Sequence, residues 1–169
     1  MLLALSTSVN ISAYQLQQSN FSTRLAVLLA AQPYVNSHYL ELEVLEISVL
    51  SDISQVFDTM SACHDLGVCF ALDDFRTGYS SLTDIKRLPA YLIKIDQSFV
   101  RDMVEDVDDL AIVESVIGLA KTYKREVIAE GVETIEHGVA SLKLVCELAQ
   151  GYRIARPTTA ADIPEWVSN

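Results

Sequence analysis

The chain has 169 residues, of which 50% are hydrophobic and 21% charged, enough for one globular domain with a hydrophobic core. Its formal net charge of -11 excludes nucleic acid as a favoured partner, because such a surface repels phosphates. The three cysteines show no CxxC spacing, which indicates reduced thiols of a cytoplasmic protein. We expect neither a signal peptide nor a membrane span, since the apolar start lacks a basic flank and every apolar run is short.

Short apolar segments rich in β-branched residues alternate along the chain with longer segments of helical periodicity. The expected elements, in chain order, are a strand at 5–12, a helix at 20–32, a strand at 39–45, a helix at 50–65, strands at 67–73 and 90–96, a helix at 106–124, a strand at 125–131, a helix at 134–148 and a short strand at 149–154.

This alternation predicts an α/β fold of βαβ units, with a parallel sheet and helices outside it. The six expected strands are two short of the eight in a closed (β/α)8 barrel. Two architectures therefore stay open, a doubly wound open sheet and a barrel of which about six of eight strands are present. The first expected strand is not followed by a glycine-rich phosphate loop, which counts against dinucleotide binding.

Five successive expected strands carry polar residues near their carboxyl ends. In parallel sheets this is the edge where ligands bind, so a polar residue on each of five strands predicts a functional site there. The residues, in chain order, are Asn10, Glu43, Asp73, Lys94 with Asp96, and Glu130.

The segment ALDDFRTGYSSL at 71–82 places two acids side by side, Asp73 and Asp74. At ~4 Å and an effective dielectric of ~20, their repulsion is about 4 kcal/mol. The two side chains point to opposite faces unless the strand ends between them, and the Thr77-Gly78 turn signal favours such an ending.

Oxygen ligands from Asn, Asp and Glu, without His or Cys, suit a hard cation such as Mg²⁺ or Mn²⁺. Two such metals bridged by a carboxylate are the usual means of phosphodiester hydrolysis. In that setting Lys94 orients or polarises the attacking water, or neutralises the acids.

Each residue also has an ordinary structural alternative. These alternatives are a cap and a solvated turn acid for Asp73 and Asp74, a surface position on an edge strand for Glu43, an ion pair between Lys94 and Asp96, and a turn for Asn10.

Six segments of the chain together resemble the EAL-domain family of cyclic-di-GMP phosphodiesterases. The resemblance implies a modified TIM barrel with one or two Mg²⁺ or Mn²⁺ ions, inhibition by Ca²⁺, and hydrolysis of one phosphodiester bond of cyclic di-GMP to linear pGpG. The segments are SVNISAYQL at 8–16, LELEVLEISVL at 40–50, ALDDFRTGYSSL at 71–82, IKIDQSFV at 93–100, VIAEGVET at 127–134 and QGYRIARP at 150–157.

Carried over by motif, the resemblance assigns a role to each polar residue. Lys94 positions the water and acts in catalysis together with Asp73 and Glu130, while Gln150 lies near a guanine and Glu46 steadies the loop after Asp74. The metal ligands it implies are Asn10, Glu43, Asp73, Asp74 and Glu130, and the supporting residues are Asp96, Gln150, Glu46, Glu133 and Arg76.

The chain departs from the family pattern in several places. The Glu-Ala-Leu motif, with its metal-binding Glu, is absent, so we expect residues 1–169 to be a single EAL-type domain whose N-terminal part and about two strands are missing. We therefore expect this chain alone to hydrolyse cyclic di-GMP weakly or not at all. The alternative is a degenerate module that binds cyclic di-GMP or a partner without catalysis. Two further departures from the family pattern are Arg76 in place of a Gly and Leu45 in place of a Thr.

The family resemblance also implies partners. We expect a homodimer through the loop after Asp74, with exchange of strands or domains as a further option, because an open barrel leaves strand edges to cover. Sensory or GGDEF-type domains are expected in the parent protein.

Two backbone conformations are open at Arg76, which replaces a Gly. A positive φ costs ~1–2 kcal/mol there, whereas a negative φ lets the Arg76 side chain reach a phosphate or Glu46.

Overall fold

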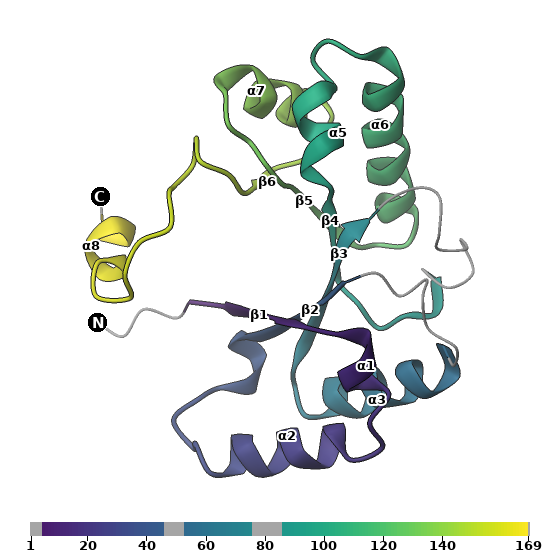
Figure 1. The fold of residues 1–169 in the computed structure, drawn as a ribbon, viewed down its shortest axis with the longest axis vertical. Helices are drawn as coiled ribbons and strands as arrows, with labels where there is room; N and C mark the ends of the chain where they lie inside the picture. Colours follow the sequence, from purple (N-terminus) through teal and green to yellow (C-terminus); the bar gives the residue numbers. More distant parts are fainter. Residues whose placement is uncertain (1–4, 46–52, 76–85, 169) are drawn as a thin grey trace.

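The computed structural model of the chain describes residues 5–45, 53–75 and 86–168. In these residues six parallel strands form one sheet in the order in which they occur along the chain (Figure 1). All six predicted strands are confirmed. They are β1 (Thr7–Ile11), β2 (Leu40–Leu45), β3 (Cys69–Phe75), β4 (Leu92–Ile95), β5 (Glu126–Ala129) and β6 (Leu148–Ala149).

The four predicted helices are also confirmed, and three short helices, α1, α5 and α8, were not expected. Two predicted starts have side-chain caps, because Asp106 accepts hydrogen bonds from the backbone N–H groups of Asp108 and Asp109, and Thr134 accepts one from that of His137. The helices are α1 (Ala13–Leu16), α2 (Phe21–Ala30), the 3-10 turn η1 (Ser37–Tyr39), α3 (Ile53–Asp65), α5 (Gln97–Asp102), α6 (Val107–Thr122), α7 (Ile135–Lys143) and α8 (Ile163–Ser168).

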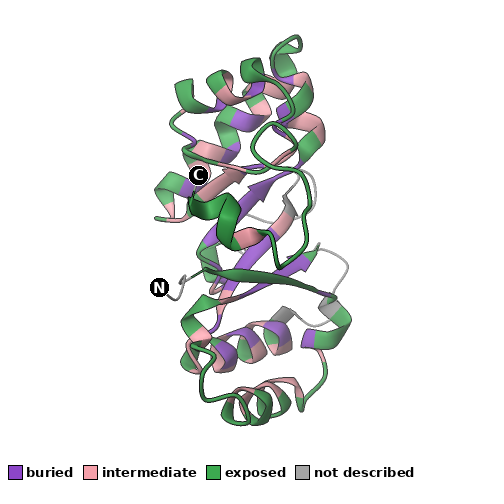
Figure 2. Cartoon of the chain, turned by 90° about the vertical axis from the view of Figure 1, so that its left-hand side faces the viewer, coloured by how far each residue is buried: buried purple, intermediate pink, exposed green. Residues whose placement is uncertain are grey.

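The helices α1, α2 and α3 lie at the β1 end of the sheet, and α5, α6 and α7 lie at the β6 end (Figure 1). Each group covers its own hydrophobic cluster. The first cluster holds Leu42, Phe70 and Leu72 from the strands, and the second holds Ile93 and Ile95. Figure 2 shows the mostly buried middle strands of the sheet between the two groups of helices, whose outer surfaces are largely exposed.

The strand register explains why both clusters lie on one face of the sheet. In one row, Leu42 of β2 pairs with Phe70 of β3. In the next row, Leu72 of β3 pairs with Ile93 of β4, which pairs with Val127 of β5, so apolar residues line up across these four strands. Because side chains alternate along a strand, the residues between them face the opposite side. Sequential strand order with the core on one face is the arrangement of a barrel and excludes the doubly wound alternative, whose strand order reverses.

Among the described residues, no helix combines the length and the apolar character needed to cross a membrane.

Candidate active site

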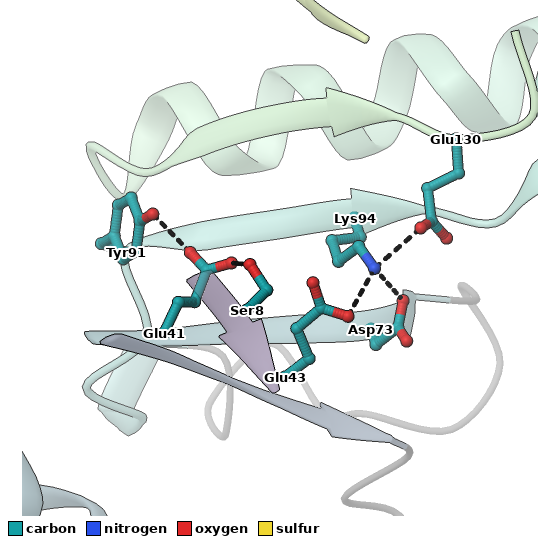
Figure 3. Close-up of polar contacts among 7 residues, drawn as sticks. All are labelled: Ser8, Glu41, Glu43, Asp73, Tyr91, Lys94 and Glu130. Atoms are coloured by element: carbon teal, nitrogen blue, oxygen red, sulfur yellow. Dashed lines mark hydrogen bonds and ion pairs between the residues drawn. The ribbon is translucent and has the colours of Figure 1, made fainter. Parts of the chain in front are cut away.

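Lys94 of β4 is the centre of a cluster on the face of the sheet that lies opposite the helices. Its Nζ is 2.8 Å from Glu43 Oε2 on β2, 3.0 Å from Asp73 Oδ1 on β3 and 2.8 Å from Glu130 Oε1 just after β5 (Figure 3). Only 4% of the Lys94 surface is exposed. Four neighbouring strands thus bring three acids and one amine together near their carboxyl ends.

The register accounts for this convergence. Glu43 pairs with Ala71, and Ala71 pairs with Leu92. Asp73 and Lys94 each lie two residues beyond those pairs on the same face, one side-chain row closer to the carboxyl ends of their strands. The long side chains of Glu43 and Lys94 span that offset.

The electrostatics of the cluster favour a charged lysine with negative charge left over. Burial lowers the pKa of Lys94, but hydrogen bonds to Glu130, Glu43 and Asp73 more than offset this, so the net pKa is raised. Burial raises the pKa of Glu130, Lys94 opposes this effect, and the charges of Asp73 and Glu43 add to it. Three carboxylates around one ammonium leave an excess of two negative charges.

The two remaining predicted metal ligands are described only in part. Asn10 on β1 pairs with Glu43 across the sheet and its side chain is exposed. Asp74 lies on β3, but its side chain is outside the described part of the structure. The expected strand ending between Asp73 and Asp74 is wrong, because β3 continues to Phe75 and instead shifts its register between Leu72 and Phe75. Such an irregularity re-aims side chains without ending the strand.

Asp96 has a helix-capping role that sequence reasoning did not foresee. Its Oδ1 accepts hydrogen bonds from the backbone N–H of Ser98, at 2.7 Å, and from the Ser98 hydroxyl. Asp96 is thereby the N-cap of α5, the short helix that follows β4. It fixes the direction in which the chain leaves the strand that carries Lys94.

Glu133 and Gln150 are both exposed and lie on neighbouring segments after β5 and β6. The Gln150 carbonyl accepts a hydrogen bond from the Val132 N–H at 3.0 Å, and the Glu133 N–H donates to Nδ1 of the buried His137 at 3.4 Å. These contacts hold the loop that follows Glu130.

Three other predictions fall on residues that the structure does not describe. Residues 46–52, which the structure does not describe, include Glu46. Residues 76–85, also outside the described part, include Arg76 and most of the predicted dimerisation loop after Asp74. The first residues of the helix predicted at 50–65 also fall within residues 46–52.

A second polar group, which the sequence did not predict, occupies the same face near the amino ends of the strands. Both the Tyr91 hydroxyl and the Ser8 hydroxyl donate to the carboxylate of Glu41, which is buried on β2 (Figure 3). Burial and the Glu41 charge raise the pKa of Tyr91, so the phenol stays protonated as a donor. In the sequence, the alternation of Glu41 with Glu43 along the β2 segment is the signal of a polar face here.

We expect Tyr91→Phe to destabilise the fold by about 1–3 kcal/mol, because it leaves one oxygen of a buried carboxylate without its donor. Urea unfolding followed by circular dichroism measures the loss. Tyr34→Phe is the matched control, because Tyr34 is 99% exposed and its hydroxyl is available to water. Equal stability of the two variants would contradict the role of the Tyr91 hydroxyl.

The chemistry of the donor set fits a hard divalent cation. Glu43, Asp73 and Glu130 supply carboxylate oxygens, and their excess negative charge matches what one divalent ion neutralises. In the described ranges, no three Asp, Glu, His or Cys side chains are arranged by themselves to hold a metal, since these acids gather around the ammonium of Lys94.

Comparisons with known proteins agree on one family. The family model described as EAL domain matches residues 2–157. Cyclic di-GMP phosphodiesterase NbdA of Pseudomonas aeruginosa is 38% identical over 76% of this chain and 16% of its own length, and cyclic di-GMP phosphodiesterase PdeF of Escherichia coli is 36% identical over 92% and 21%. The solved PaMucR phosphodiesterase, a complex with c-di-GMP, gives a TM-score of 0.86 at 34% identity over 94% of this chain and 64% of that chain. The chain thus spans about a fifth of the length of these curated relatives.

Proposed function

We propose, on the premise that this chain belongs to the EAL domain family, that its site hydrolyses one phosphodiester bond of cyclic di-GMP to linear pGpG. The observation that carries the proposal is the convergence of Glu43, Asp73 and Glu130 on the buried Lys94 at the ligand-binding edge of the sheet. The names of the relatives NbdA and PdeF support the choice of substrate.

The site would hold Mg²⁺ or Mn²⁺ through five oxygen-bearing side chains. When bound, the metals supply Lewis-acid polarisation of the phosphate and a water that ionises near neutral pH. The ligands we propose are Asn10, Glu43, Asp73, Asp74 and Glu130.

Lys94 keeps its proton in this scheme, and the positive charge of its ammonium orients the attacking water. Its carboxylate partners on β2, β3 and after β5 fix the direction of its Nζ before substrate binds. Such preorganisation avoids the cost of rearranging charges during the reaction. Asp96 supports Lys94 by capping the helix that directly follows β4.

The remaining supporting residues would contact the ligand from the rim of the site. We propose that Gln150 lies near a guanine and that Glu133, Glu46 and Arg76 support the loops around it. The exposure of Gln150 and Glu133 beside the Glu130 loop is compatible with these roles. As the family resemblance implies, we further propose a cytoplasmic homodimer, with sensory or GGDEF-type domains in the parent protein.

We expect cyclic di-GMP incubated with this chain and Mg²⁺ or Mn²⁺ to yield linear pGpG slowly, and Asp73→Asn to reduce the rate by about 100-fold or more. The amide of Asn keeps the shape of the side chain but removes its charge. Chromatography of the nucleotides measures the rate. Asp58→Asn, an exposed change on α3, is the control and is expected to leave the rate unchanged.

A non-catalytic receptor for cyclic di-GMP is the second candidate. It is favoured by the arrangement of the described acids around Lys94 rather than around a common metal centre. Calorimetry separates the two functions: cyclic di-GMP that binds but stays intact with either metal would overturn the hydrolase and support the receptor.

A further inference from the structure

Helix α7 buries polar side chains and exposes apolar ones, the reverse of an ordinary amphipathic helix. His137 and Ser141 are 8% and 2% exposed, whereas Ile135, Val139 and Leu142 are 59%, 43% and 62% exposed. The buried pair is satisfied locally, because the Ser141 hydroxyl donates to the His137 carbonyl and His137 Nδ1 accepts from the chain before it. The branched residues, spaced i, i+4 and i+7, therefore form an apolar stripe on the outer side of the helix.

Two residues of that stripe line a groove beside α6. Ile135 and Val139 meet Leu110 of α6 and Val104 from the turn after α5 around a groove of about 540 Å³. These elements pack together at one end of the molecule (Figure 1). A groove bordered by two helices and floored with branched apolar side chains has the shape that accepts a third helix.

The border of this groove is strongly acidic. Glu114 and Glu136 stand at its edge with one cation, Lys143. A second depression shares Val104 and Glu136 with the groove, and it adds the acids Asp102, Glu105, Asp106 and Asp109.

Among the residues that the structure describes, Arg101–Asp102 is the one ion pair made by these acids. Arg101 lies in the second depression and forms an ion pair with Asp102, with 2.7 Å between Arg101 Nε and Asp102 Oδ1. Desolvation raises the pKa of Asp109, the charges of Asp106, Asp102 and Asp108 raise it further, and the charge of Arg101 offsets only part of this rise. The acids thus repel one another, and a cationic partner would relieve that repulsion.

We propose that this groove docks a basic amphipathic helix from another polypeptide segment. Apolar residues of that helix, at i, i+3 or i+4, and i+7, cover the stripe formed by Ile135 and Val139, while its Lys or Arg residues pair with the acidic border. A second copy of the same surface is a poor occupant, because it would bring two acidic borders together.

The test uses a fluorescein-labelled peptide of roughly 18 residues, about five helical turns, with Leu at helical spacing and Lys elsewhere. Its matched control carries Glu in place of every Lys. Fluorescence anisotropy is expected to show a micromolar Kd for the Lys peptide, weaker at about 0.3 M than at about 0.05 M NaCl, and at least about ten-fold weaker binding of the Glu peptide.

Two double variants locate the binding surface. Ile135→Ser with Val139→Ser removes the apolar floor, and Glu114→Lys with Glu136→Lys reverses the border charge; each is expected to weaken the Lys peptide about ten-fold or more. Val107→Ser, an exposed apolar change on α6 outside the groove, is expected to leave binding unchanged. Circular dichroism verifies that every variant is folded.

Two results would overturn the proposal. One is equal binding of the Lys and Glu peptides, or binding that neither double variant weakens. The other is self-association of the chain in analytical ultracentrifugation that the Ile135→Ser/Val139→Ser variant abolishes, since the groove would then be an interface between copies.

Discussion

We expect Lys94→Met to lower the free energy of unfolding at neutral pH by about 3–5 kcal/mol, the cost of removing one partner from a buried charge cluster. Three carboxylates lie within 3.0 Å of the Lys94 Nζ and would face one another without it. Methionine keeps an unbranched side chain of similar length, so the lost packing is small. The same change is expected to abolish hydrolysis, because the proposed water-orienting group is gone.

The stability loss in Lys94→Met should shrink as the pH falls. Burial raises the pKa of Glu130, Lys94 opposes this, and Asp73 and Glu43 add to it. Without the ammonium, the pKa of Glu130 rises further. A carboxyl whose pKa is higher in the folded than in the unfolded state binds its proton more tightly when folded. Lowering the pH through the folded-state pKa toward the unfolded-state pKa therefore stabilises the fold.

Urea unfolding at about pH 7 and about pH 5 measures both effects, with the slope m as a check on two-state behaviour. Lys121→Met is the matched control, because Lys121 is exposed on α6 and is expected to lose no more than about 0.5 kcal/mol at either pH. If Lys94→Met were as stable as the parent chain at neutral pH, the buried cluster would not exist as described.

The fold was predictable from the sequence because burial follows simple periods. Alternating residues such as Leu42 and Val44 on β2 pack under the helices, while Glu41 and Glu43, which alternate with them, face the other side. The same alternation predicts the row of polar side chains near the carboxyl ends of the strands. Sequence pattern thus identifies the face and the edge of the sheet where Lys94 and its acids lie.

The contacts within that edge were not predictable, because they depend on register and on short elements. Periodicity does not show that Glu43 reaches Lys94 two strands away, since the offset comes from how β2, β3 and β4 pair. Helix α5 has six residues, too few to show a helical period in the sequence. The sequence pattern therefore places Asp96 at the end of a strand, whereas it is the N-cap of α5. Tyr91 carries no sequence mark that separates a buried hydroxyl donor from a packing ring.

The loop that carries Glu130 is held in place by a close backbone contact at Gly151. Val132, two residues after Glu130, donates its N–H to the Gln150 carbonyl and accepts from the Arg153 N–H, both at 3.0 Å. A Cβ added at Gly151 would lie 2.4 Å from both the Val132 N and the Val132 O. These are backbone atoms of a buried residue, so no side chain can swing aside to make room.

We therefore expect Gly151→Ala to destabilise the fold by about 1–3 kcal/mol, the usual cost of overpacking a tight site. Because the contact lies two residues from Glu130, the added methyl also displaces that carboxylate from Lys94. A shift of ~1 Å in a reacting group costs about 100-fold in rate. Turnover of cyclic di-GMP at a temperature where the variant is fully folded separates this effect from unfolding.

Gly118→Ala is the control that isolates the contact. Gly118 lies within α6, and a Cβ there meets nothing within 4 Å, so alanine is expected to stabilise the helix by about 0.5–1 kcal/mol. Both variants restrict the unfolded chain in the same way, so the difference between them reports only the folded state. If Gly151→Ala stabilised the chain as Gly118→Ala does and kept full turnover, Gly151 would have no part in positioning Glu130.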